Sequence, residues 1–383
     1  MRTWSRRRVF SGLGVAAAAV GAGVYWAARP TPAPIGFPIA PDELAAARQL
    51  LARHPAVDAH AHPGRSFVDG AQNLSGLVWI YARLGSFEDD TIADMRAGGL
   101  AAAAFAAVAD FQALGLQGEG LAAVRAFEPG EAWASYRRQI DRLKGLASRG
   151  LVFPVKTVAD VAAARAAGKV GALLTVEGGD FLEGRVDRVA LAHADGVRSI
   201  TLMHYRNNEL GDIITGEPVH QGLTPAGRAV VREMNRLGML VDVAHASEAT
   251  ALGVLDASSQ PVIASHVHVR GKATHPRFIS PALMRAVVAK GGGLVGAWPA
   301  GIAIVDLRGF VDRALELVEL AGIDHVCLGT DMDANYKPVF DTYAHLPHFV
   351  AGLAQRGLAE GDIAKLIGGN YLRLLAAVQS AGA

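Results

Sequence analysis

The sequence predicts a single (β/α)8 barrel. From about residue 56 onward, eight short apolar runs alternate with amphipathic stretches, and most of these runs end in a histidine or a carboxylate. A doubly wound open sheet is the competing fold. It is disfavoured because no glycine-rich phosphate loop follows any of the expected strands.

The first 34 residues predict an export signal or a membrane anchor, followed by a linker. They contain five arginines and no acidic residue, and Arg6-Arg7-Arg8 precedes Phe10 and an apolar run from Leu13 to Ala28. A basic segment before an apolar one is typical of export signals, and paired arginines favour the twin-arginine route. No clear cleavage site follows, so an uncleaved anchor stays open. We expect an exported protein, periplasmic or membrane-anchored facing the periplasm, with residues 35–383 as its one catalytic domain.

Composition excludes several classes of protein. Hydrophobic residues make up 51% of the chain and charged residues 19%, which predicts a large core rather than disorder. Beyond residue 34 the chain is net acidic, so it lacks the basic surface of a nucleic-acid binder. The single cysteine, Cys327, rules out an intrachain disulfide and a cysteine-based zinc cage, and we expect it in the core. Any metal must therefore be held by His, Asp or Glu.

The expected strands are almost continuously apolar, as strands buried on both faces should be. They cover residues 56–62, 100–108, 170–177, 197–204, 240–245, 262–266, 294–298 and 326–331. Amphipathic helices are expected at 225–237, 248–257, 281–290 and 309–321. The first of these has clear end signals, because Thr224 can cap it and Gly238 can end it. The insert at 112–149 is expected to be helical and to cover the barrel mouth.

Six of the eight expected strands carry a metal- or proton-binding residue at or near the C-terminal end. These residues are His60 and His62, Glu177, His204, His245, His266 and Asp331. A barrel brings all its C-terminal strand ends to one face, where active sites are built. A lone buried histidine would be read as a core residue, but six strands that share the pattern predict a site.

The spacing of these residues predicts two metal ions. His60 and His62 point the same way from one strand and can reach one ion, while His245 and His266 lie on successive strands and can share another. Glu177, followed by two glycines, can bridge both. Two ions about 3.5 Å apart would share a hydroxide, and Asp331 is placed to take and return its proton. For Asp58 two roles stay open, a hydrogen bond to a metal-bound imidazole or one to the backbone.

Several longer stretches resemble the membrane (renal-type) dipeptidases and their bacterial relatives. The resemblance covers about residues 56–375. Its most specific parts are Gly222-Leu-Thr-Pro-Ala-Gly-Arg228, Val241-Asp-Val-Ala-His-Ala-Ser247, Pro261-Val-Ile-Ala-Ser-His266, His275-Pro-Arg277, Gly329-Thr-Asp-Met-Asp333 and Gly368-Gly-Asn-Tyr-Leu-Arg373.

The resemblance implies a metal-dependent hydrolase of dipeptides that tolerates a D-residue at the C-terminal side. Two divalent ions, expected to be Zn²⁺, would be held by His60, His62, Glu177, His245 and His266. His204 would contact the oxygen of the scissile carbonyl, Arg277 would bind the substrate carboxylate, and Asp331 would shuttle the proton. The implied partner is a small dipeptide-like molecule, and a homodimer is left open.

Three positions depart from the family pattern. His62 replaces an aspartate, Asp180 replaces a histidine, and Tyr205-Arg-Asn-Asn-Glu209 replaces an Asn-Thr-Pro-Trp-like loop. The first departure removes a negative charge from the metal site, which should lower the pKa of the bridging water or alter metal preference. The other two lie near the substrate and put its identity in question.

Two other functions therefore stay open. The His-x-His pair is typical of amidohydrolases that cleave a lactone, a cyclic amide or a phosphoester, although such enzymes commonly bridge their metals with a modified lysine. A metal-binding protein without activity is the other alternative. The presence of all five ligand candidates together with Asp331 and His204 argues against it.

Overall fold

Eight parallel strands close into a barrel in this computed structural model, which describes residues 33–117, 120–271 and 273–382. Neighbouring strands follow the order β2-β1-β11-β10-β9-β8-β7-β6, and β2 pairs with β6 to close the ring. This closure confirms the predicted (β/α)8 barrel and excludes the open sheet. The strands are β1 (Ala56–Ala61), β2 (Leu100–Val108), β6 (Val170–Glu177), β7 (Ser199–Thr201), β8 (Leu240–Asp242), β9 (Ile263–Val267), β10 (Leu294–Ala297) and β11 (Val326–Leu328).

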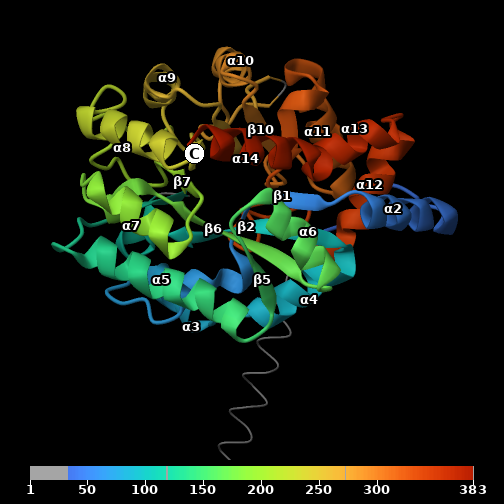
Figure 1. The fold of residues 1–383 in the computed structure, drawn as a ribbon, viewed down its shortest axis with the longest axis horizontal. Helices are drawn as coiled ribbons and strands as arrows, with labels where there is room; N and C mark the ends of the chain where they lie inside the picture. Colours follow the sequence, from blue (N-terminus) through green and yellow to red (C-terminus); the bar gives the residue numbers. More distant parts are fainter. Residues whose placement is uncertain (1–32, 118–119, 272, 383) are drawn as a thin grey trace, which may run out of the picture. The chain divides into compact units, whose positions relative to one another are not determined.

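Helices surround these strands (Figure 1). They are α2 (Pro41–Arg53), α3 (Gly76–Arg83), α4 (Glu88–Gly98), α5 (Glu131–Ser148), α6 (Val158–Ala166), α7 (Asp187–Asp195), α8 (Pro225–Arg236), α9 (Glu248–Ala257), α10 (Pro281–Ala289), α11 (Leu307–Ala321), α12 (Leu346–Gln355), α13 (Glu360–Ala364) and α14 (Asn370–Ala381). The end signals of α8 act as predicted. Thr224 Oγ1 accepts a hydrogen bond from the Gly227 amide at 3.0 Å, and Gly238 follows with a φ of 65°.

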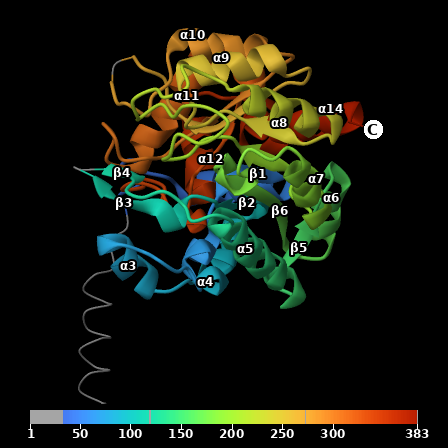
Figure 2. The ribbon, with the colours of Figure 1, turned by 90° about the vertical axis from the view of Figure 1, so that its left-hand side faces the viewer.

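The insert between β2 and β6 is only partly helical, so this prediction was wrong in part. Before α5, the strands β3 (Leu114–Gln117) and β4 (Gly120–Ala123) form an antiparallel hairpin, which lies beside α3 (Figure 2). After α5, the short strand β5 (Val152–Val155) pairs with the first half of β6, outside the ring. The amide of Ala123 donates to the Tyr205 carbonyl at 3.2 Å, so the hairpin borders the C-terminal rim of the barrel.

The opposite end of the barrel is filled. Leu240, Ile263 and Leu294, which lie at the starts of their strands, form one buried cluster with Leu374 and Val378 of α14. Cys327 is buried in the same cluster, as predicted. Because this end is packed with apolar side chains, the polar residues at the C-terminal strand ends are the ones available for chemistry.

Residues 34–383 form one unit of the structure. The export signal or anchor expected at the N-terminus falls on residues 1–32, outside the described residues. Among the residues that are described, we find no helix with the length and apolarity needed to cross a membrane.

Candidate metal centre

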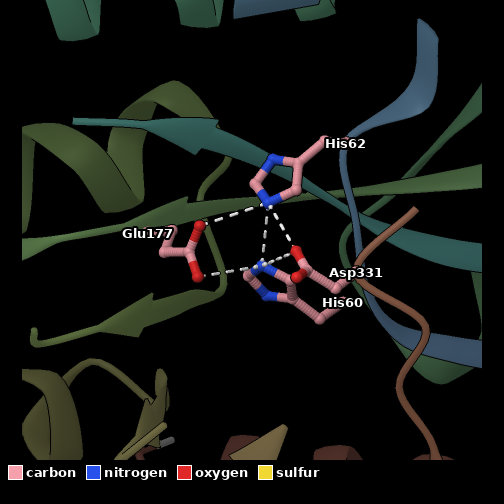
Figure 3. A group of neighbouring side chains, drawn as sticks. All are labelled: His60, His62, Glu177 and Asp331. Atoms are coloured by element: carbon pink, nitrogen blue, oxygen red, sulfur yellow. Dashed lines mark hydrogen bonds and ion pairs between the residues drawn. The ribbon is translucent and has the colours of Figure 1, made fainter. Parts of the chain in front are cut away.

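The five side chains predicted to bind metal converge on the carboxylate of Glu177, at the end of β6. Nε2 of His62 lies 3.2 Å from Oε2 of Glu177, and Nε2 of His60 lies 3.3 Å from Oε1 (Figure 3). Nε2 of His245, three residues after β8, and Nε2 of His266, on β9, lie 3.2 and 3.3 Å from the same Oε1. All five side chains are buried. Residues up to 206 positions apart in the sequence therefore share one small volume.

The histidines form two pairs, each with the spacing of ligands on one ion. The Nε2 atoms of His60 and His62 are 3.1 Å apart, and those of His245 and His266 are 2.9 Å apart. Two imidazoles bound to one tetrahedral zinc at its usual bond lengths would place their nitrogens about 3.3 Å apart. Oε1 of Glu177 is buried without a hydrogen-bond donor among the described residues. This donor set fits divalent cations, for which both histidine pairs and Glu177 would be ligands.

Hydrogen bonds at the far side of two rings direct their lone pairs inward. Nδ1 of His62 donates to the Ala106 carbonyl at 3.1 Å. Nδ1 of His266 lies 2.9 Å from Ser265 Oγ, whose own proton goes to Asp242 Oδ2 at 2.5 Å. Because Nδ1 carries the proton in both rings, Nε2 is the atom free to bind a metal.

The electrostatics of the site also suit cations. Burial alone would lower the pKa of His62, but its hydrogen bonds with Asp331 and Glu177 raise that pKa to about 10. Burial alone would raise the pKa of Glu177, but His204 and His60 lower it well below its usual range. Glu177 and Asp331 thus stabilise the protonated, positively charged form of His62 in the metal-free chain. A metal cation bound at the same place would displace that proton.

Asp331 lies at the edge of the cluster, after β11. Its Oδ1 is 3.3 Å from His62 Nε2, and its Oδ2 accepts a hydrogen bond from Trp298 Nε1 at 3.3 Å. The side chain is 14% exposed, unlike the buried ligands, so it reaches the open side of the site. Burial would raise its pKa, but the charge of His266 and the hydrogen bond with His62 lower it. Asp331 is therefore a carboxylate near neutral pH, as a proton acceptor must be.

His204, after β7, has a hydrogen-bond partner, Asp110, that was not predicted from the sequence. Its Nδ1 lies 2.6 Å from Oδ1 of Asp110, and its Nε2 lies 3.2 Å from Oε2 of Glu177. Both ring nitrogens face carboxylates, which only accept, so each carries a proton. Asp110 is fully buried and stands two residues beyond β2. The imidazole can therefore donate from Nε2 into the site.

The guanidinium of Arg277 is buried and has no hydrogen-bond acceptor among the described residues. The residue is 3% exposed, and its Nε and both terminal nitrogens have no acceptor within the part of the chain that the structure describes. Its Cζ lies 5.2 Å from the ring centre of Trp298. Burial, followed by the charge of Arg277, lowers the pKa of His245 well below its usual range. The ring of Trp298, against which Arg277 lies, is 6.3 Å from that of His266, so the guanidinium is close to the cluster of metal-ligand candidates. Such a group can bind an anion bidentately.

Two of the departures from the family pattern contact each other. Arg206 donates to Oδ1 of Asp180 at 2.7 Å, and Asn208 donates to Oδ2 at 3.3 Å. Asp180 is nearly fully buried, and burial together with the charge of Asp110 raises its pKa to about 6. The loop after β6 and the loop after β7 are thus joined beside His204.

Two roles were left open for Asp58, a hydrogen bond to a metal-bound imidazole or one to the backbone, and the structure shows the second. Its Oδ1 accepts from the amides of His60 and Thr330 at 3.1 and 3.0 Å, and its Oδ2 accepts from the hydroxyl groups of Thr330 and Tyr343. These bonds tie β1 to the loop after β11, which carries Asp331. Asp58 therefore positions backbone rather than an imidazole.

Comparison with curated proteins finds fungal relatives. The chain is 33% identical to dipeptidase tcpJ of Claviceps purpurea over 224 residues, which cover 56% of this chain and 53% of the relative. It is 31% identical to dipeptidase aclJ of Aspergillus oryzae over 268 residues, 66% of this chain and 64% of the relative. The matches thus span less than two thirds of these relatives.

Solved structures share the fold. The probable dipeptidase PvdM of Pseudomonas aeruginosa superposes with a TM-score of 0.73 at 20% identity, over 89% of this chain and 99% of that one. A metallopeptidase of Rhodobacter sphaeroides, solved with a phosphinate mimic of the dipeptide L-Ala-D-Ala, gives 0.69 at 23% identity, over 85% and 99%. A sequence model of the membrane dipeptidases, peptidase family M19, matches residues 44–383. The chain therefore belongs to the membrane dipeptidase family.

Proposed function

We propose that this protein hydrolyses dipeptides, including those with a D-residue at the C-terminal side. The observation that carries the proposal is the unpartnered, buried guanidinium of Arg277 beside the metal cluster. A buried cation is costly unless an anion pairs with it, and the free carboxylate of a dipeptide would supply that anion within reach of the cations.

Each step would use a residue already in place. When bound, two divalent cations would supply an acidified water and polarise the scissile carbonyl. Asp331 would take the proton of that water and return it to the leaving amine. His204 would donate from Nε2 to the carbonyl oxygen as negative charge develops there, and Arg277 would hold the substrate carboxylate.

We propose zinc as the metal and two ions as the stoichiometry. Four imidazoles and one carboxylate are a ligand set that zinc accepts, and the two histidine pairs share the carboxylate of Glu177. Metal analysis of the purified protein tests this directly. Two zinc equivalents per chain are expected, and one equivalent or none would contradict it.

Hydrolysis of a lactone, a cyclic amide or a phosphoester is the second candidate, which the His-x-His pair of His60 and His62 at the end of β1 favours. A panel of L,L- and L,D-dipeptides, lactones and phosphotriesters separates the two candidates. Turnover confined to dipeptides with a free carboxylate supports the proposal. Turnover of neutral esters or lactones alone would overturn it, because these substrates give Arg277 no anion to bind.

We also propose that the chain is a bacterial, exported member of the family, periplasmic or anchored by its N-terminus, and that it forms a homodimer. The paired arginines before an apolar run support export. The oligomeric state is tested by sedimentation of the purified protein, where a monomer at all concentrations would contradict a dimer.

A further inference from the structure

Tyr205 is an aromatic side chain of the site to which the proposed mechanism gives no role. Its ring centre lies 4.5 Å from that of His204 and 5.1 Å from that of His245. It stands at the start of the loop that departs from the family pattern. The phenol therefore lies against the group that would contact the scissile carbonyl and against a metal-ligand candidate.

The backbone of Tyr205 is held on both sides. Its amide donates to Oδ2 of Asp110 at 3.0 Å, and its carbonyl accepts from the amide of Ala123 on β4 at 3.2 Å. The other oxygen of Asp110 binds His204. One buried carboxylate thus fixes the imidazole of His204 and the backbone of Tyr205 together.

The charge that acts most strongly on the phenol is that of Arg277. Burial raises the pKa of Tyr205 to about 12, and Arg277 is the largest electrostatic influence against this rise. The same guanidinium lowers the pKa of His245. Arg277 lies against Trp298, whose ring centre is 6.3 Å from that of His266, and His266 pairs with His245. Tyr205 and Arg277 therefore border the same pair of histidines. A phenol carries its proton at neutral pH, so the hydroxyl of Tyr205 can donate a hydrogen bond.

We propose that the hydroxyl of Tyr205 donates a hydrogen bond to the substrate carboxylate that Arg277 binds, an inference that rests on the proposed function. A carboxylate has about four lone-pair positions, and a bidentate guanidinium occupies two of them. A neutral donor on the same side can satisfy a third. Tyr205 then selects substrates with a free C-terminal carboxylate.

The test compares zinc-loaded wild type, Tyr205→Phe and Tyr336→Phe on L-Ala-D-Ala and on its C-terminal amide. Tyr336 is 54% exposed and outside the site, so its variant is the matched control. For Tyr205→Phe we expect KM on the free acid to rise about 10-fold to 100-fold with kcat little changed, since one hydrogen bond to a charged group is lost. The kcat/KM on the amide should stay at the wild-type value.

A second comparison uses Arg277→Gln. Removing the Tyr205 hydroxyl in that background should raise KM far less than in wild type, because the two donors share one anion. Thermal melting and zinc content of each variant exclude a folding or metal defect. Equal losses on the acid and the amide would place the phenol at the scissile bond and overturn the proposal, as would an unchanged KM.

The proposed function can be refuted independently of the role of Tyr205. If wild type neither hydrolyses L-Ala-D-Ala nor binds a phosphinate analogue of it by calorimetry, dipeptide hydrolysis is wrong and the inference falls with it. If wild type does both and Tyr205→Phe matches it in KM and in affinity for the analogue, the function stands and only the role of Tyr205 is refuted.

Discussion

Asp180 and Arg206 form a buried ion pair of 2.7 Å between two loops where the sequence departs from the family pattern. The two substitutions are 26 residues apart in the chain, yet each supplies the charge that the other needs. A carboxylate at position 180 without Arg206 would be buried unpaired. The pair therefore ties the loop after β7 to the turn that follows β6.

The pair predicts a pH dependence of stability. The folded-state pKa of Asp180 is about 6, above the ordinary value of 3.8, so the native state binds this proton more tightly than the unfolded chain. Stability should fall as the pH rises from about 4 to about 6 and level off above that. In the metal-free protein, the free energy of unfolding of wild type minus that of Asp180→Asn should follow this course in urea titrations.

Asp187→Asn is the control for this titration. Arg185 lowers the pKa of the exposed Asp187, so its contribution should not fall as the pH rises. A difference between wild type and Asp180→Asn that is constant from about pH 4 to about pH 7 would show that Asp180 titrates as it does in the unfolded chain.

The hydrogen bond between Asp110 and His204 predicts that a substitution at Asp110 lowers catalytic activity through His204. In Asp110→Asn the neutral amide no longer supplies the negative charge beside Nδ1 of His204, so the doubly protonated ring is no longer stabilised there. We expect kcat to fall about 10-fold to 100-fold with two metals retained. Steady-state kinetics and metal analysis of the same preparation measure both. Asp187→Asn, at an exposed position on α7, is a control for the exchange of aspartate for asparagine itself.

Asp331→Asn should preserve fold and metal content while removing most turnover. The amide keeps the shape and can still accept from Trp298, but it cannot take a proton from water. A loss of about 100-fold to 10,000-fold in kcat is expected for a missing general base. Activity within a few-fold of wild type would remove Asp331 from the mechanism.

Much of the barrel is visible in the sequence because buried parallel strands have a simple pattern. Each of the eight apolar runs became a strand, and the polar residues that end them meet because a barrel gathers those ends at one rim. The strands β3, β4 and β5 were missed because they have four residues each and no continuous buried pattern.

The contacts of Asp110 and Tyr205 in the site could not be predicted from the sequence for a different reason. Asp110 stands two residues past its strand, and its partner His204 lies 94 positions later, so no local spacing connects them. Tyr205 looked like part of a divergent loop until the fold placed it between His204 and His245. Contacts of this kind depend on how strands are arranged around the ring, which local periodicity does not encode.

The N-terminal segment gives a prediction about location. Replacing Arg7 and Arg8 together by lysine keeps the charge but removes the arginine pair that the twin-arginine route reads. We expect the full-length variant to remain in the cytoplasm of a bacterial host, detected by fractionation. Arg2→Lys, outside the pair, should be exported normally. Delivery of the double variant to the periplasm would show that another route carries the chain.

His62 offers the last test, because it is the ligand candidate in which this chain departs from its family. Its Nε2 lies 3.1 Å from Nε2 of His60 and 3.2 Å from Oε2 of Glu177. The family resemblance places an aspartate at this position, and carboxylates are ordinary zinc ligands, so we expect an aspartate to serve here as well. His62→Asp should therefore keep two metals per chain by elemental analysis. His62→Ala should lose the first ion, since one ligand disappears without replacement. If His62→Asp lost both ions, the pair formed by His60 and His62 would not be an interchangeable half of a two-metal centre.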